Sequence, residues 1–414
     1  MPDVDVAASV VETFGGAPGL GVPMSSTPPF GAYQGEIYRA GLNGDLPPFT
    51  THAEALEDSA RQRLEPGPFW YVAGAAGVGA TARANREAFD RWRIVPRMLR
   101  DTTRRTLSTA ILGTAMPAPV LLGPVGIQAI IHPDGELATA RAAAALGVPM
   151  VLSTVSSHTL EEVAQASGEA PRWFQLYWPH DDEVCASLLR RARAAGYTVL
   201  VVTLDTWTLA WRPHDLDLSY LPLLRGLGTA NAFSDPAFRA RLAQPPERDR
   251  AAAVTRWLAM FTGTALSWTR LSLLRENWDG PIVLKGIQHV DDARRAVDAG
   301  MDGIVVSNHG GRQVDGAIAS LDALPPIAAA VGGQIEVLFD SGVRTGADAV
   351  KALALGAGAV LIGRPLAYGL AHGGEPGVRH VLRTLLADFD LTLGLSGYRT
   401  PGELTHEALQ RRPE

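Results

Sequence analysis

The sequence predicts an eight-stranded parallel β/α barrel, the TIM barrel, and two observations support this fold. From Pro119 onward, short runs of β-branched and other apolar residues alternate with longer segments that are rich in Ala, Leu and Arg and have a helical period. About eight such units occur, which is the number that closes a TIM barrel. The expected strands are Pro119–Pro124, Val148–Thr154, Trp173–Tyr177, Thr198–Asp205, Pro281–Gly286, Gly303–Asn308, Ile335–Ser341 and Ala359–Arg364.

The expected strands are continuous apolar runs and do not alternate between apolar and polar residues. Such runs are typical of parallel strands that are buried on both faces. A doubly wound open sheet is the alternative fold. The polar residues that follow nearly every strand favour the closed barrel, because closure brings all of these positions to one cavity.

The other segments frame a single barrel domain over residues 33–414. Residues 1–32 are rich in Ala, Val, Pro, Gly and Ser and predict a flexible N-terminal lead-in. Helical patterns at Thr51–Leu64 and Thr81–Phe89 predict an N-terminal helical segment. After the fourth strand the alternation stops, so residues 206–266 predict a long irregular insertion that lies over the barrel mouth as a lid.

Composition excludes several classes of protein. Of the 414 residues, 46% are hydrophobic and 19% are charged, and the net charge of −6 argues against a nucleic-acid binder. Cys185 is the sole cysteine, so an internal disulfide and a cysteine-rich metal site are excluded. No apolar run approaches the roughly 20 residues that cross a bilayer, and Met1-Pro2-Asp3 starts no basic signal-peptide region. We expect a soluble, cytoplasmic protein without a membrane partner.

Polar and titratable residues follow almost every expected strand. The active site of a TIM barrel lies at the carboxyl ends of its strands, so these residues are expected to line one cavity. In chain order they are Gly123 to Gly126, Ser153 and Thr154, Gln175 and Tyr177, Thr203 and Asp205, Lys285 and Gly286, Ser307 to Gln313, Asp340 to Arg344, and Gly363 and Arg364.

The loops after the last two strands predict a phosphate site. Each loop combines a glycine, Gly342 or Gly363, with an arginine, Arg344 or Arg364. In TIM barrels these two loops commonly hold a phosphate through backbone N–H groups and a helix N-terminus. For either loop alone, a tight turn with a solvated arginine is an equally good explanation. Because the two loops are adjacent in the barrel, their combination favours a phosphate-bearing ligand.

Lysine occurs only at Lys285 and Lys351, although Lys and Arg together number 37. A lysine retained against this bias suggests a role that guanidinium does not fill. Lys285 ends a buried strand, and three roles are open to it. It forms a Schiff base as in a class I aldolase, or it stabilises an anionic cofactor, or it extends to solvent without a chemical role.

The segment from Ser307 to Gln313 contains the expected general base. His309 is the side chain there whose pKa suits proton transfer near neutral pH. A lone histidine is more often structural, but the strand-end position and Arg312, which would bind a carboxylate, favour catalysis. Asp205 ends another strand and would pair with protonated His309 and raise its pKa. No cluster of His, Asp and Glu has the spacing of metal ligands, so no metal is expected.

These motifs resemble the FMN-dependent α-hydroxy-acid oxidising family, from about Tyr33 to the C-terminus. The likeness is carried by S-N-H-G-G-R-Q at Ser307–Gln313, K-G-I-Q at Lys285–Gln288, D-S-G-V-R at Asp340–Arg344 and I-G-R-P at Ile362–Pro365. Within the family the sequence is most similar to the lactate 2-monooxygenases. That likeness is carried by Glu36–Tyr38, Tyr71–Gly74, Pro96–Leu99, Thr203–Trp207 and Trp211–Pro213.

The resemblance implies a role for each site residue. His309 is the catalytic base, Asp205 supports its protonated form, Arg312 and Arg212 bind the substrate carboxylate, and Tyr71 and Tyr177 hydrogen-bond the substrate. Lys285 stabilises the reduced flavin, which settles its role against a Schiff base. The implied FMN contacts are Pro124, Val125, Gly126, Ser153, Gln175, Thr203, Lys285, Ser307, Asp340, Gly342, Arg344, Gly363 and Arg364.

The resemblance also implies the reaction, which is oxidation of a small L-2-hydroxy acid, lactate above all, with O2 as acceptor. If the insertion retains the keto acid, peroxide decarboxylates it and lactate yields acetate, CO2 and water. If the keto acid leaves first, the enzyme is an oxidase that releases peroxide. A dehydrogenase with another acceptor and a class I aldolase built on Lys285 are the alternatives. Gly126 matches a small residue of the monooxygenases, and a homo-oligomer, tetramer or octamer, is expected.

Overall fold

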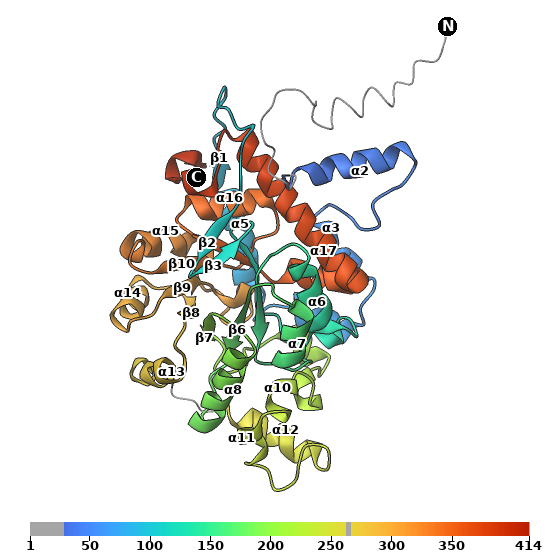
Figure 1. Cartoon of the computed structure of the whole chain (residues 1–414), viewed down its shortest axis with the longest axis vertical. Helices are drawn as coiled ribbons and strands as arrows, with labels where there is room; N and C mark the ends of the chain where they lie inside the picture. Colours follow the sequence, from blue (N-terminus) through green and yellow to red (C-terminus); the bar gives the residue numbers. More distant parts are fainter. Residues whose placement is uncertain (1–28, 262–265, 414) are drawn as a thin grey trace.

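The computed structural model describes residues 29–261 and 266–413. Eight parallel strands close into a barrel in the order β4-β5-β6-β7-β8-β9-β10-β11 (Figure 1), which confirms the predicted TIM barrel. Each expected strand is present; β6 and β8 are shifted by one residue, and the others are shorter than expected. The strands are β4 Val120–Leu122, β5 Met150–Ser153, β6 Arg172–Leu176, β7 Leu200–Thr203, β8 Ile282–Ile287, β9 Gly303–Val306, β10 Glu336–Phe339 and β11 Ala359–Ile362.

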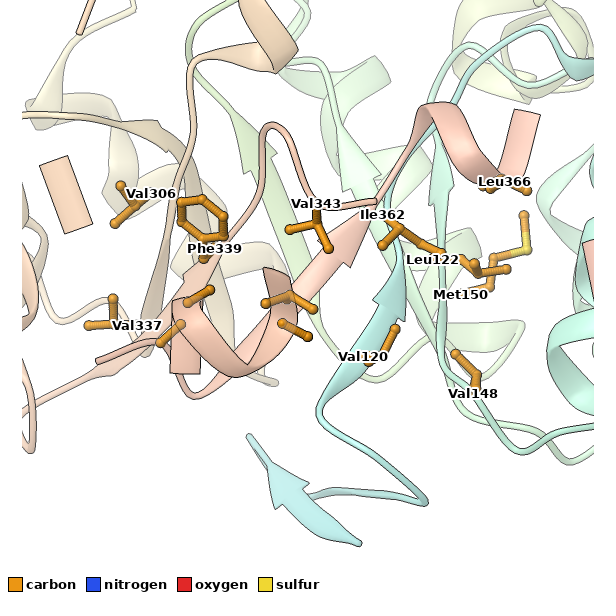
Figure 2. Packing of buried hydrophobic residues seen from close by; sticks show 14 of the residues in the cluster. Val120, Leu122, Val148, Met150, Val306, Val337, Phe339, Val343, Ile362 and Leu366 are labelled. Carbon is orange, nitrogen blue, oxygen red and sulfur yellow. The ribbon is translucent and has the colours of Figure 1, made fainter. Parts of the chain in front are cut away.

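Alternate residues of these strands belong to two separate hydrophobic cores, as the period of two along a strand requires. One core fills the barrel with side chains that include Leu121, Val151, Trp173, Val305 and Leu361. The other core packs the outer face against the helices. Figure 2 shows part of it, where Val120, Leu122, Met150, Phe339 and Ile362 lie among the side chains of this outer layer. Burial on both faces explains the continuous apolar runs in the sequence.

The surrounding helices alternate with the strands along the chain. They are α6 Gly135–Ala144, α7 Leu160–Ser167, α8 Asp182–Ala194, α13 Leu271–Asn277, α14 Val290–Asp298, α15 Ser320–Val331, α16 Gly346–Ala354 and α17 Arg364–Leu395, the last being interrupted at Gly373 and Gly374. Among the described residues, no helix is long and apolar enough to span a membrane.

The N-terminal part adds four helices and the two short sheets that no strand pattern predicted. The helices are α2 Ala32–Leu42, α3 Ala55–Arg61, α4 Pro66–Ala73 and α5 Ala80–Asp90. Strands β2 Thr109–Ile111 and β3 Thr114–Met116 form a hairpin, and β1 Trp92–Ile94 pairs with β12 Leu409–Arg411. Ile111 and Met116 of the hairpin join the core inside the barrel. Of the predicted lead-in, only residues 29–32 lie within the described part of the chain.

The insertion after β7 is not the irregular segment that the sequence predicted. Its described part contains α9 Pro213–Asp217, the 3₁₀ turn η2 Pro222–Arg225, α10 Ala230–Phe233, α11 Pro236–Arg239 and α12 Arg250–Ala259. Figure 1 shows α10, α11 and α12 grouped beyond α8, at one end of the molecule. Phe238 and Trp257 pack there against Val184 and Leu188 of α8 in a small core of their own. These helices are four to ten residues long, too short to produce a clear periodic pattern.

We predict that Gly346→Ala lowers the free energy of unfolding by roughly 1–3 kcal/mol. A Cβ atom on Gly346 would lie 2.1 Å from the backbone nitrogen of Phe389, so α16 and α17 would have to separate. Gly41→Ala is the matched control, because nothing lies within 4 Å of the added methyl group and alanine favours the helix. Urea unfolding measures both variants, and equal loss in both would contradict the packing argument.

Candidate active site

A cavity of about 470 Å³ opens at the carboxyl ends of the barrel strands, where the sequence placed the site. Its wall combines residues from α4, from the loops after the strands and from the insertion. The predicted site residues that line it are Tyr71, Pro124, Val125, Gly126, Tyr177, Arg212, Lys285, His309, Arg312, Asp340, Gly342, Arg344, Gly363 and Arg364.

The other predicted residues, Asp205 and four polar residues that would contact FMN, are not part of the cavity wall. The four are the buried Ser153, Gln175, Thr203 and Ser307. Ser153 Oγ donates to Gln175 Oε1 at 3.1 Å, and Gln175 Nε2 donates to Thr203 Oγ1 at 3.0 Å. This chain fixes the orientation of the Gln175 amide across three adjacent strands, so the residues form a preorganised polar row.

His309 is held in a strained backbone conformation with φ of 57°, in the left-handed region that non-glycine residues rarely adopt. Its backbone N–H donates to Ser307 Oγ at 3.1 Å. Its ring Nδ1 lies 2.8 Å from Asp205 Oδ1. Since a carboxylate only accepts hydrogen bonds, Nδ1 carries the proton, and Nε2 is the ring nitrogen that remains to take a proton from a substrate.

The net pKa of His309 is lowered, although Asp205 acts to raise it as the sequence predicted. Burial is the largest influence and lowers the pKa, and Lys285 acts in the same direction, whereas Asp205 acts against both. For Asp205, burial alone would raise the pKa, but His309 and Lys285 outweigh it and hold the pKa at about 2. At neutral pH the pair therefore consists of a neutral imidazole and a carboxylate, which is the state that a general base requires.

Thr206 belongs to this pair, although the sequence analysis did not select it. Its Oγ1 donates to Asp205 Oδ1 at 3.0 Å and lies 3.0 Å from His309 Nδ1. With its proton directed to Asp205, the hydroxyl oxygen accepts from the Nδ1–H group, so both partners favour the same tautomer. The only signal in the sequence was its position directly after Asp205.

Lys285 is buried between two carboxylates. Its Nζ lies 3.1 Å from Asp340 Oδ2 and 4.0 Å from Asp205 Oδ2, and it donates to Ser307 Oγ at 2.9 Å. Burial lowers the pKa of Lys285, but Asp340 and Asp205 outweigh burial and the net pKa is raised. The amine therefore stays protonated. This argues against a Schiff base, which needs a neutral amine, and supports a fixed positive charge.

Three partly buried arginines of the cavity wall, Arg312, Arg344 and Arg364, form no ion pair with any described residue. Arg312 and Arg364 both donate to the carbonyl oxygen of Gly74, at 2.8 and 2.9 Å. Burial, and then repulsion from Arg212 and Arg364, lowers the pKa of Arg312 to about 9. Burial, and then Arg364, lowers the pKa of Arg344 to about 10. Guanidinium groups that are buried without an acid mark a site for anionic ligands.

Arg212 and the two tyrosines complete the substrate end of the cavity. Arg212 Nη2 donates to Gln313 Oε1 at 2.7 Å, and its Nε donates to the backbone carbonyl of Arg312 at 3.0 Å. These bonds place the two guanidinium groups side by side. Burial, and then Asp205, raises the pKa of Tyr177 to about 12, and burial also raises the pKa of Tyr71. Both tyrosines are therefore neutral hydrogen-bond donors at physiological pH.

The wall fits a ligand that carries a phosphate at one end, which is what FMN requires. Arg344 and the start of α17 lie at this end with two glycines. Gly342 has φ of 104°, and a Cβ on it would lie 2.9 Å from the Asn85 carbonyl oxygen. A Cβ on Gly363 would meet only Val125, at 3.9 Å, so its backbone is open to a ligand. Arg364 differs from the expectation in one respect, since it donates to carbonyls of Gly74 and Gly310.

Comparison with known proteins identifies the class of enzyme. Residues 60–411 match the family model of the FMN-dependent dehydrogenases. The chain belongs to this family, and its cofactor is FMN. The fold and the site thus define an FMN-dependent α-hydroxy-acid oxidoreductase, as the sequence motifs predicted.

Individual relatives match nearly the whole chain. The FMN-dependent alpha-hydroxy acid dehydrogenase qulF of Penicillium citrinum is 50% identical over 386 residues, which are 92% of this chain and 96% of the relative. An L-lactate oxidase of Lysinibacillus sphaericus is 43% identical over 350 residues, covering 84% and 90%. The crystal structure of a mandelate oxidase superposes with a TM-score of 0.77 at 40% identity, covering 88% of this chain and 99% of that one.

We predict that Thr206→Val lowers the rate of flavin reduction by a 2-hydroxy acid about tenfold, or about 1.4 kcal/mol, which is typical of a hydrogen bond to a charged group. Valine keeps the shape of threonine and removes the hydroxyl group that holds the His309–Asp205 pair. Thr206→Ser keeps that hydroxyl group and should retain most of the rate. Anaerobic stopped-flow absorbance of FMN measures both, and a normal rate in the valine variant would contradict the role of Thr206.

The same rate is expected to fall on the acidic side with a limb centred below pH 6.5, and to reach its plateau at higher pH. Neutral His309 is the reactive form, and its pKa lies below the ordinary value of 6.5, so the base is already deprotonated at neutral pH. Asp205→Asn should move the acidic limb to lower pH, because the substitution removes the negative charge that raises the pKa of His309. A limb centred at or above pH 6.5 in the native enzyme would show that Asp205 dominates over burial.

Proposed function

We propose that this enzyme oxidises an L-2-hydroxy acid, with lactate among its substrates, and uses O2 as the electron acceptor. The observation that carries the proposal is the convergence of three groups on one cavity: the free Nε2 of His309, the guanidinium groups of Arg312 and Arg212, and the ammonium group of Lys285. A 2-hydroxy acid needs a base at its alcohol carbon and a cation for its carboxylate. The names of the L-lactate oxidase and mandelate oxidase relatives support O2 as acceptor.

Each side chain then has a defined task. Arg312 and Arg212 bind the carboxylate, and Tyr71 and Tyr177 donate hydrogen bonds to the substrate oxygens, which together fix the orientation of the α-carbon. His309 Nε2 removes a proton from the bound substrate, and Asp205 stabilises the imidazolium that results. Lys285 holds positive charge beside the position of the flavin. FMN, when bound, accepts the two electrons that leave the substrate and delivers them to O2.

We further propose that the described part of the insertion, residues 206–261, retains the keto acid, so that lactate and O2 give acetate, CO2 and water. The segment contributes Leu221, Leu223 and Leu258 to the cavity wall, which supports a covering role. Gly126 supports this branch less than the sequence suggested. A Cβ there would lie 2.6 Å from Val155 Cγ2, so close packing alone requires glycine. Release of pyruvate and peroxide is therefore the second candidate.

Product analysis after mixing the purified enzyme with L-lactate in air tests both branches. Acetate with little peroxide is the expected result. Stoichiometric pyruvate and peroxide would show that the enzyme is an oxidase and not a monooxygenase. His309→Gln is the control for the site, and it should keep FMN bound while substrate-dependent reduction falls roughly 10²–10⁴-fold, the usual contribution of a positioned base. Near-normal turnover in this variant would remove His309 from its role.

Two further expectations stay predictions. A homo-oligomer, tetramer or octamer, is to be checked by light scattering of the purified enzyme. The cytoplasmic location is to be checked by fractionation of the source cells.

A further inference from the structure

The geometry points to a 2-hydroxy acid with a bulky apolar group, aryl or branched alkyl, as the preferred substrate of this enzyme. This inference rests on the proposed function and specifies the one substrate group that it leaves open. Of the four substituents on the α-carbon, the carboxylate goes to Arg312 and Arg212, and the hydroxyl group and the hydrogen go to the side of His309. Only the fourth substituent is free to differ between substrates.

Much of the cavity wall beyond these anchors is apolar. We call this region the apolar chamber and define it by Val155, Leu221, Leu223, Trp257, Leu258 and Phe261. Five of these residues come from the insertion, and Val155 comes from the loop after β5. None of the six carries a titratable side chain, whereas the anchor end of the cavity holds His309, Lys285 and the arginines. The cavity wall thus combines charged groups from the strand ends with apolar residues from the insertion.

The chamber is built into the fold. Turn η2 and helix α12 pack against each other. Arg250 Nη2 from α12 donates to the carbonyl oxygen of Gly226, the residue that ends η2, at 2.7 Å. Trp257 is almost fully buried and packs edge-on against Phe238 of the insertion core. A wall that is fixed by its own core offers a ligand a preformed surface and does not have to be ordered on binding.

Partial burial of the chamber residues indicates a ligand surface. Leu221, Leu223 and Leu258 are neither buried nor fully exposed, and they face the cavity with apolar carbon atoms. The single methyl group of lactate covers little of this surface. Each further methylene group that becomes buried contributes about 0.8 kcal/mol, which is roughly fourfold in binding of the transition state. A second charge on the substituent would lose its hydration and meet no cation among these six residues, only the unpaired Trp257 Nε1–H group, so dicarboxylic hydroxy acids are disfavoured.

A substrate series on the native holoenzyme tests the inference. The rate of anaerobic FMN reduction at limiting substrate is measured for L-lactate, L-2-hydroxyisocaproate, L-mandelate and L-malate. We expect 2-hydroxyisocaproate or mandelate to exceed lactate by at least about tenfold, and malate to fall below lactate. The inference would be overturned if the rate with lactate equalled or exceeded the rates with both bulky acids, or if the rate with malate were comparable to theirs. If none of the acids reduces the flavin, the proposed function itself fails.

A variant pair connects the preference to the chamber. Leu258→Ala should lower the rate with 2-hydroxyisocaproate relative to the rate with lactate by several-fold to about tenfold, in the range of a lost hydrophobic pocket contact. Leu216→Ala is the matched control, because Leu216 is exposed on α9 and does not line the cavity. The lactate rate reports whether the anchors and FMN are intact. A parallel loss for both acids, or the same loss in the control, would show that the chamber does not select the substrate.

Discussion

The site depends on one buried carboxylate, Asp205, which lies between an imidazole and an ammonium group. Asp205 Oδ1 is 2.8 Å from His309 Nδ1, and Oδ2 is 4.0 Å from Lys285 Nζ. Burying three ionisable groups is costly unless they compensate one another. Here Asp340 and Asp205 together keep Lys285 charged, and burial keeps His309 neutral against the influence of Asp205. Asp205 therefore lies between a charged ammonium group and a neutral imidazole.

Closure of the barrel makes this arrangement possible. Asp205 and His309 are 104 positions apart in the chain. They meet because they follow strands β7 and β9 of the closed barrel, which are separated only by β8. Lys285 lies on β8 between them. The insertion after β7 then adds apolar residues to the cavity wall, next to the charged groups at the strand ends. One scaffold thus holds the chemical groups on strand ends, and a separate segment with its own small core supplies the surface that meets the substrate side chain.

Much of the fold and of the chemistry was predictable from local patterns. The eight continuous apolar runs predicted the strands because burial on both faces leaves no polar alternation, and the motif around His309 predicted the enzyme family. The three-residue strands β1, β2, β3 and β12 were not predictable, since such short runs carry no period of their own. The short helices of the insertion were not predicted for the same reason. Thr206 was missed because its partners, Asp205 and His309, meet only in the folded chain.

The sequence alone determined which groups exist and at which strand ends they lie: one lysine where arginine is the rule, one histidine beside an arginine, and glycines at the phosphate end. The tertiary structure decided how these groups act. The net direction of the His309 pKa, the protonation of Lys285 and the apolar chamber all depend on burial and on distances between residues that are remote in the chain. Electrostatic energy depends on distance and on exclusion of water, and neither quantity can be obtained from the order of the residues alone.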